Sequence, residues 1–146
     1  MSSSPPSPPT PPPPPPRGRR AGAPPAKRSL QSALIVLDHP EVLPTSSWTR
    51  AVAVLGRRAL EVGLDDLWRT ISPGMTRVSR RAQFICLGYF IDRSTAGDTY
   101  DAWSRLSGAC HHHVVDLPPT DDELRSWLGA VDRFLVAVSG AMAVGR

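Results

Sequence analysis

Apolar residues recur every three or four positions along most of the chain after residue 47, a spacing typical of amphipathic α-helices. The first such stripe consists of Trp48, Val52, Leu55, Ala59 and Val62. We predict that Ser46 or Ser47 caps this helix and that Gly63 ends it, because glycine is common just after a helix C-terminus. Residues 64–71 then give a short second helix, followed by a turn at Pro73.

The next two stripes predict a third helix, capped by Thr76, and a fourth helix over about residues 99–113. We expect the third helix to be central in the fold because apolar residues cover a wide face of it. These residues are Val78, Ala82, Phe84, Ile85, Leu87, Tyr89 and Phe90. On the fourth helix Trp103, Leu106 and Cys110 share an apolar face, and Asp98, Asp101, Arg105 and His112 lie roughly opposite.

The clearest local signal is the run from Thr120 to Glu123, a capping box with acidic residues in its first turn. It predicts the start of a fifth helix that fades after Gly140. Near the other end of the chain, residues 29–39 form either a short helix or an extended segment packed on the domain, ended by Pro40. No hairpin signal is present. The predicted fold class is therefore all-α, a small helical bundle of four to five helices.

Residues 1–28 have a different composition from the rest of the chain. They contain 12 of the 17 prolines and no Val, Ile, Leu, Phe, Trp or Tyr, so they cannot bury enough apolar surface to offset the entropy of ordering. We predict a disordered Pro/Arg-rich tail over residues 1–28 and one folded domain over residues 29–146. The tail carries a net charge of +5, whereas the domain has 12 basic and 13 acidic residues. The basic character of the chain therefore belongs to the tail.

The two cysteines, Cys86 and Cys110, are too few for a disulfide framework and fall within apolar helical stripes. No signal peptide is apparent, and no apolar run approaches the ~18 residues of a membrane span. Walker loops, dinucleotide fingerprints, zincin motifs and nucleophile elbows are also missing from the sequence. We expect a cytoplasmic protein without membrane association.

Three consecutive histidines, His111, His112 and His113, leave three interpretations open. They could bind a metal together with Cys110, but structural zinc sites normally use separated ligand pairs, so we expect neither metal nor cofactor. They could instead finish the helix, where a histidine gains from the helix dipole. They could also perform acid–base chemistry, because Arg105 precedes His112 by two helical turns less ~20°. Such a pair suits RNA cleavage, with the arginine on the phosphate and the histidine moving a proton.

An all-α bundle in which an arginine precedes a histidine by a short spacer near a helix end resembles the HEPN superfamily. Both Arg105-x6-His112 and Arg105-x5-His111 fit that spacing. The stretch 102–128 also resembles uncharacterised actinobacterial HEPN-like proteins, in which a histidine cluster precedes a proline-broken loop and a Trp-bearing helix. The resemblance covers about residues 47–138. It implies a helical, often dimeric domain; several members are RNases, whereas others are binding or assembly modules.

Two functional classes follow from the resemblance. We favour a binding or assembly module for a partner protein or nucleotide, because active members commonly have a polar residue directly after the arginine, where this chain has Leu106. The alternative is a metal-independent RNase of toxin–antitoxin type, with His112 or His111 as general base and Arg105 on the phosphate. The candidates for nucleic-acid contact are Arg77, Arg80 and Arg81. The expected partners are another protein or a second copy of the chain, with weak RNA binding.

Overall fold

The computed structural model describes residues 23–44, 47–111 and 117–145, and every regular element within these ranges is helical. The five α-helices are α1 (Pro25–Asp38), α2 (Trp48–Ile71), α3 (Arg80–Cys86), α4 (Arg93–Cys110) and α5 (Asp121–Val144). Three short 3-10 helices connect them: η1 (Pro40–Val42), η2 (Pro73–Arg77) and η3 (Leu87–Tyr89). The prediction of an all-α fold is confirmed.

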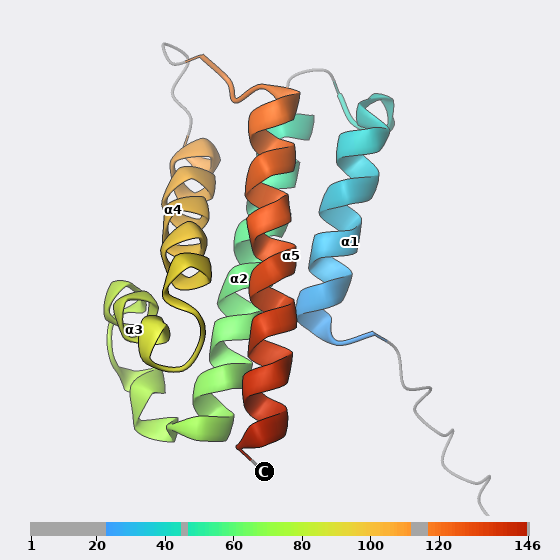
Figure 1. Cartoon of the computed structure of the whole chain (residues 1–146). Coiled ribbons are helices and arrows are strands. Elements are labelled where there is room, and N and C mark those ends of the chain that lie inside the picture. The colour runs from blue at the N-terminus through green and yellow to red at the C-terminus, as the bar shows by residue number, and fades with distance from the viewer. Residues whose placement is uncertain (1–22, 45–46, 112–116, 146) are drawn as a thin grey trace, which may run out of the picture.

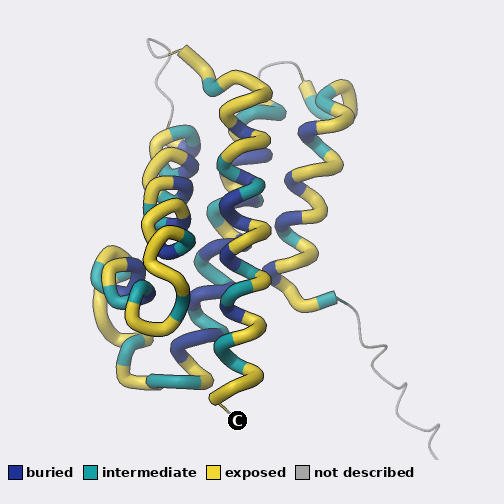
Figure 2. The backbone as a smooth tube through the Cα atoms, in the orientation of Figure 1, coloured by how far each residue is buried: buried dark blue, intermediate teal, exposed yellow. Residues whose placement is uncertain are grey.

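The four long helices pack side by side and alternate in direction along the chain (Figure 1). α1 and α4 run one way, whereas α2 and α5 run the other way. α2 contacts each of the other three long helices, so it occupies the centre of the bundle. Its fully buried residues include Leu60, Leu64, Leu67 and Trp68. Figure 2 shows the buried residues along the facing sides of the helices and the exposed residues along their outer sides.

Gly63 does not end a helix, because α2 continues through it for a total length of 24 residues. Its role is to let α5 come close: a Cβ atom at Gly63 would lie 2.6 Å from Leu135 Cδ2. Gly56 is placed in the same way, with its Cβ position 2.8 Å from Leu128 Cδ2. Each pair is seven residues apart on its helix, close to two turns, so the two glycines form one strip on α2 that receives α5.

α1 begins at Pro25, four residues before the predicted boundary of the domain. Proline suits the first turn of a helix, since its φ angle is already helical and no partner is needed there for an N–H group. The buried stripe of this helix consists of Ala26, Leu30, Ala33 and Leu37. Residues 25–28 therefore belong to the fold, and the segment 29–39 is helical through Asp38. The rest of the predicted tail, residues 1–22, lies outside the described residues.

α3 is short and peripheral, which corrects the expectation of a central third helix. Its cap is Ser79, whose Oγ accepts a hydrogen bond from the Ala82 N–H at 3.2 Å. The predicted cap, Thr76, instead donates its hydroxyl to the Pro73 carbonyl within η2 at 2.7 Å. Phe84 and Leu87 are buried, whereas Ile85, Tyr89 and Phe90 are exposed. The wide apolar stripe is divided because the helix stops at Cys86 and the chain tightens into η3.

α4 begins at Arg93, six residues earlier than predicted, because Asp92 caps it. The carboxylate Oδ2 of Asp92 accepts a hydrogen bond from the Thr95 N–H at 2.9 Å. The helix ends at Cys110, with His111 as the residue that follows it, rather than continuing to residue 113 as predicted.

α5 begins where the sequence predicted. Thr120 Oγ1 accepts from the Glu123 N–H at 3.2 Å, and Glu123 Oε2 accepts from the Thr120 N–H at 2.8 Å, so the capping box is confirmed. The helix does not fade at Gly140 but continues to Val144. A helical glycine costs only ~1 kcal/mol, and Ala141 and Met142 pack against the core beyond it.

Candidate functional site

The predicted Arg–His pair is only partly within the described structure. Arg105 lies on the exposed side of α4, opposite the buried Leu106 and Cys110, as predicted. α4 ends before the histidines, and His111 is exposed immediately after it. His112 lies outside the described residues, so the pairing of Arg105 with His112 stays a prediction.

Arg105 lines two open grooves between α4 and α5. The upper groove has a volume of about 750 Å³, and its walls come from the end of α4, the connection to α5 and the first turns of α5. Its lining residues are Arg105, Gly108, Ala109, Leu117, Pro118, Pro119, Thr120, Glu123 and Trp127. A second groove of about 310 Å³ continues along the two helices and is lined by Asp98, Asp101, Ala102, Arg105, Ser126, Trp127, Ala130 and Arg133. Arg105 and Trp127 are the two residues common to both grooves, so we call the joined grooves the Arg105 groove.

The Arg105 guanidinium forms no ion pair with any other residue that the structure describes. The nearby carboxylate of Glu123 is already engaged by the backbone N–H and hydroxyl of Thr120. Those hydrogen bonds, with a smaller contribution from the charge of Arg105, hold the pKa of Glu123 below its usual value. Glu123 is therefore an ionised helix cap, and the donors of Arg105 remain directed to the groove.

This arrangement is chemically suited to a small anion attached to a flat apolar group. A guanidinium presents a planar fork of N–H donors that matches phosphate and carboxylate oxygens. Trp127 is half-buried against the core, and its remaining surface lines the groove. An aromatic side chain of this kind can stack on a base at an energy of ~1–3 kcal/mol.

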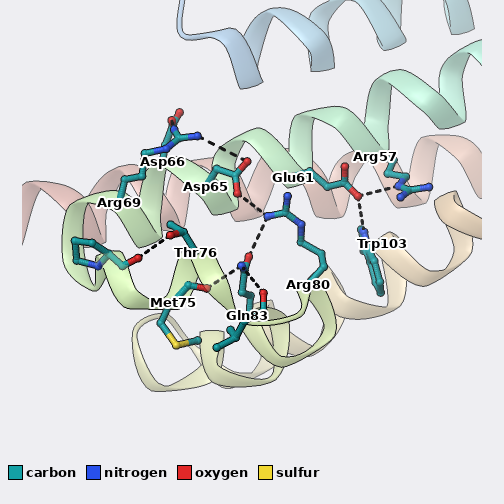
Figure 3. Close-up of polar contacts among 12 residues, drawn as sticks. Arg57, Glu61, Asp65, Asp66, Arg69, Met75, Thr76, Arg80, Gln83 and Trp103 are labelled. Atoms are coloured by element: carbon teal, nitrogen blue, oxygen red, sulfur yellow. Dashed lines mark hydrogen bonds and ion pairs between the residues drawn. The ribbon is translucent and has the colours of Figure 1, made fainter.

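The three arginines predicted to contact nucleic acid do not act as one patch. Arg80 is half-buried, and its Nη1 donates to Asp65 Oδ1 at 2.6 Å and to Gln83 Oε1 at 2.9 Å (Figure 3). Gln83 is buried and in turn donates to the Met75 carbonyl at 2.9 Å. Arg80 therefore ties α3 to α2, whereas Arg77 and Arg81 are exposed.

A polar cluster that the sequence analysis missed ties α4 to α2. Glu61 Oε1 accepts from Arg57 Nε at 2.8 Å and from the indole N–H of Trp103 at 3.2 Å (Figure 3). Cys110 lies beside this cluster, and burial raises the pKa of its thiol, while the charge of Arg57 acts in the opposite direction. The helical spacing between Arg57 and Glu61 could have indicated their ion pair, but no sequence signal indicated the bond from Trp103.

Both cysteines are free. Within residues 23–44, 47–111 and 117–145 no three His, Cys, Asp or Glu residues are placed to hold a metal ion. His112 and His113 fall outside these ranges, so the metal interpretation of the histidine run is not tested.

α5 corrects one expectation of the sequence analysis. By length and composition alone it could cross a membrane, and it is the one helix in the described part of the chain with that property. It nevertheless packs on α2, α4 and α1, with Leu124, Leu128, Val131 and Phe134 buried. Its apolar composition is therefore partly explained by its place in the bundle.

Comparison of the chain with protein-family models, with curated proteins and with solved structures finds no match. The HEPN-like resemblance consequently depends on the residues that carry it.

Proposed function

We propose that the chain is a HEPN-like helical domain that acts as a binding module, and that its ligand is a nucleotide held in the Arg105 groove. The observation that carries this proposal is the position of Arg105: it is exposed, common to both grooves and without an ion pair among the described residues. An unpaired guanidinium in a concave site favours a ligand with a phosphate group.

The charges around the groove favour a small ligand over a long nucleic acid. Asp98, Asp101 and Glu123 line the same walls, so a polyanion that extended along the groove would meet three carboxylates. Non-specific nucleic-acid binding instead depends on many basic contacts to successive phosphates. One phosphate on Arg105, with a base against Trp127, satisfies the groove without that conflict.

Calorimetric titration with adenosine 5′-monophosphate and with adenosine tests the proposal. Arg105→Ala should weaken binding of the nucleotide about tenfold or more, because a charge-assisted hydrogen bond contributes ~1.5–3 kcal/mol, and should leave adenosine binding nearly unchanged. Trp127→Leu keeps apolar volume in the core and should weaken both ligands. Arg58→Ala, at an exposed position on α2, is the matched control. Absence of nucleotide binding, or equal binding by wild type and Arg105→Ala, would refute the proposal.

Metal-independent RNase activity is the second candidate, favoured by the exposure of both Arg105 and His111 near the end of α4. Leu106 weighs against it, because this residue is fully buried and no polar group accompanies the arginine. If the activity exists, single-stranded RNA is cleaved in the presence of EDTA. Loss of the general base by His112→Ala or His111→Ala then lowers the rate ~10²–10⁴-fold, and replacing the 2′-hydroxyl by hydrogen abolishes cleavage. Intact RNA after incubation with folded wild-type protein excludes this candidate.

A further inference from the structure

The outer side of α5 in its C-terminal half is apolar and uncovered. Val136 is 68% exposed and Val144 is 88% exposed, and Gly140 lies between them at helical spacing. Only 28% of the most apolar 18-residue stretch of α5 is buried. A helix that is apolar on all sides is normally covered on all sides. We call the exposed strip formed by Val136, Gly140, Ala143 and Val144 the α5 ridge; it lies along the lower half of α5 in Figure 2.

An open groove flanks the α5 ridge on each side. One groove, of about 280 Å³, separates α5 from the start of α1 and is lined by Pro24, Lys27, Ser139 and Met142 among others. The other, of about 580 Å³, separates α5 from the segment after α3, where Tyr89 is 80% exposed. A Cβ atom at Gly140 would have no heavy atom within 4 Å, so the backbone of the ridge is open to close approach.

We propose that the α5 ridge and its two grooves form the interface for a second copy of this chain, related to the first by a two-fold axis. A ridge between two grooves is a shape that an identical surface can complement, since the ridge of each copy enters a groove of the other. Isologous pairing requires such self-complementarity. The exposed Tyr89 and Val136 would supply the apolar anchors that dominate interface energies.

The charges at the rim favour an identical partner over other occupants. Lys27 stands on the α1 side of the first groove, and Asp66 and Asp132 stand on the opposite side. Under two-fold symmetry the lysine of each copy can face an aspartate of the other. An anionic lipid surface would be repelled by the two aspartates, and a basic peptide by the lysine.

The size of the surface is in the range of a stable dimer. Residues 132–144 of α5 extend over ~20 Å. The ridge with its flanking elements is about 30 Å wide, since neighbouring helices lie 8–10 Å apart. The resulting ~600 Å² per copy is at the upper end of apolar patches on monomers and approaches the ~800 Å² per partner of a standard interface. The surface also lies at the opposite end of the bundle from the Arg105 groove, so dimerisation and nucleotide binding can be tested separately.

Sedimentation velocity over a wide range of protein concentrations tests the proposal on the full chain. Wild type should reach the mass of two chains. Val136→Lys should raise the dimer dissociation constant roughly a hundredfold or more, because symmetry places the substitution twice in one interface. Ile35→Lys is the matched control, since Ile35 is 59% exposed on the far half of α1, and it should dimerise as wild type does. Thermal melting of each variant verifies that the fold is kept.

A charge exchange then distinguishes the two-fold arrangement from any pairing within one chain. Lys27→Asp and Asp132→Lys each place like charges across the proposed interface and should each dimerise poorly alone. Mixing the two variants restores opposite charges at both symmetry-related contacts, so a mixed dimer should form. A monomeric wild type, a dimer indifferent to Val136→Lys, or no gain on mixing would overturn the proposal. Flotation of wild type with phospholipid vesicles, lost in Val136→Lys, would overturn it in favour of a lipid surface.

Discussion

Replacing Gly63 by alanine is expected to destabilise the protein, although the same substitution stabilises an ordinary helix. Gly63 lies within α2 where α5 crosses closest. A methyl group there would lie 2.6 Å from Leu135 Cδ2 and 3.0 Å from Phe134 Cε1. Phe134 is fully buried and cannot move freely, so either Leu135 changes its rotamer or α5 shifts as a whole.

The magnitude follows from two opposing effects. Overpacking a core costs ~1–3 kcal/mol, whereas alanine in place of a helical glycine gains up to ~1 kcal/mol. Gly63→Ala should therefore lower the free energy of unfolding by up to about 2 kcal/mol. Gly97 provides the matched control on α4, since a Cβ atom there would have no heavy atom within 4 Å. Gly97→Ala should keep the whole gain, so the same exchange has opposite signs at the two sites.

Urea denaturation followed by circular dichroism measures both effects as shifts of the midpoint at constant slope. Gly56→Ala should behave like Gly63→Ala, because its Cβ position lies 2.8 Å from Leu128 Cδ2. If Gly63→Ala raised the midpoint as much as Gly97→Ala does, the close approach of α2 and α5 would be wrong.

Three further predictions concern the caps and the thiols. Thr120→Ala should cost about 1 kcal/mol in urea denaturation, whereas Ser47→Ala should cost little, because Ser47 precedes α2 without a side-chain cap bond. The pKa of Glu123 is lowered by the Thr120 hydrogen bonds, so its stabilising effect is complete above pH 4.5, the ordinary value, and is lost as the pH falls through the lowered pKa; Glu123→Gln should flatten the acid side of the melting profile. In the native protein a maleimide should modify the half-buried Cys86 before Cys110, whose thiol is buried and has a raised pKa, and the reverse order would show that α4 opens from α2.

Periodicity and capping chemistry were enough to predict the number and kind of the elements. The stripe from Trp48 placed the start of α2, and the capping box at Thr120 placed the start of α5 to the residue. The polar and apolar sides of α4 were also correct, with Leu106 buried and Arg105 exposed. These features depend on residues within a few positions of one another, where local rules are strongest.

The wrong predictions share one cause, which is that tertiary contacts decided between local alternatives. Gly63 could end a helix or permit a close crossing, and only the position of α5 shows which applies. The wide apolar stripe near Phe84 could belong to a central helix, but α2 already fills the centre. Pro25 could belong to a tail or to a first turn, and the burial of Ala26 against the bundle favours the turn.

The site itself was within reach of the sequence in one respect and beyond it in another. Arg105 lies five residues before the end of α4, and Trp127 lies six residues after the start of α5. At 1.5 Å per residue, antiparallel packing of consecutive helices puts both side chains within ~9 Å of the same end of the bundle. Their convergence in one groove follows from helix ends and a short connection alone. The missing ion partner of Arg105 does not follow, because it depends on Thr120 holding the carboxylate of Glu123 at the start of α5. The cap that fixes the helix therefore also leaves the arginine available to a ligand.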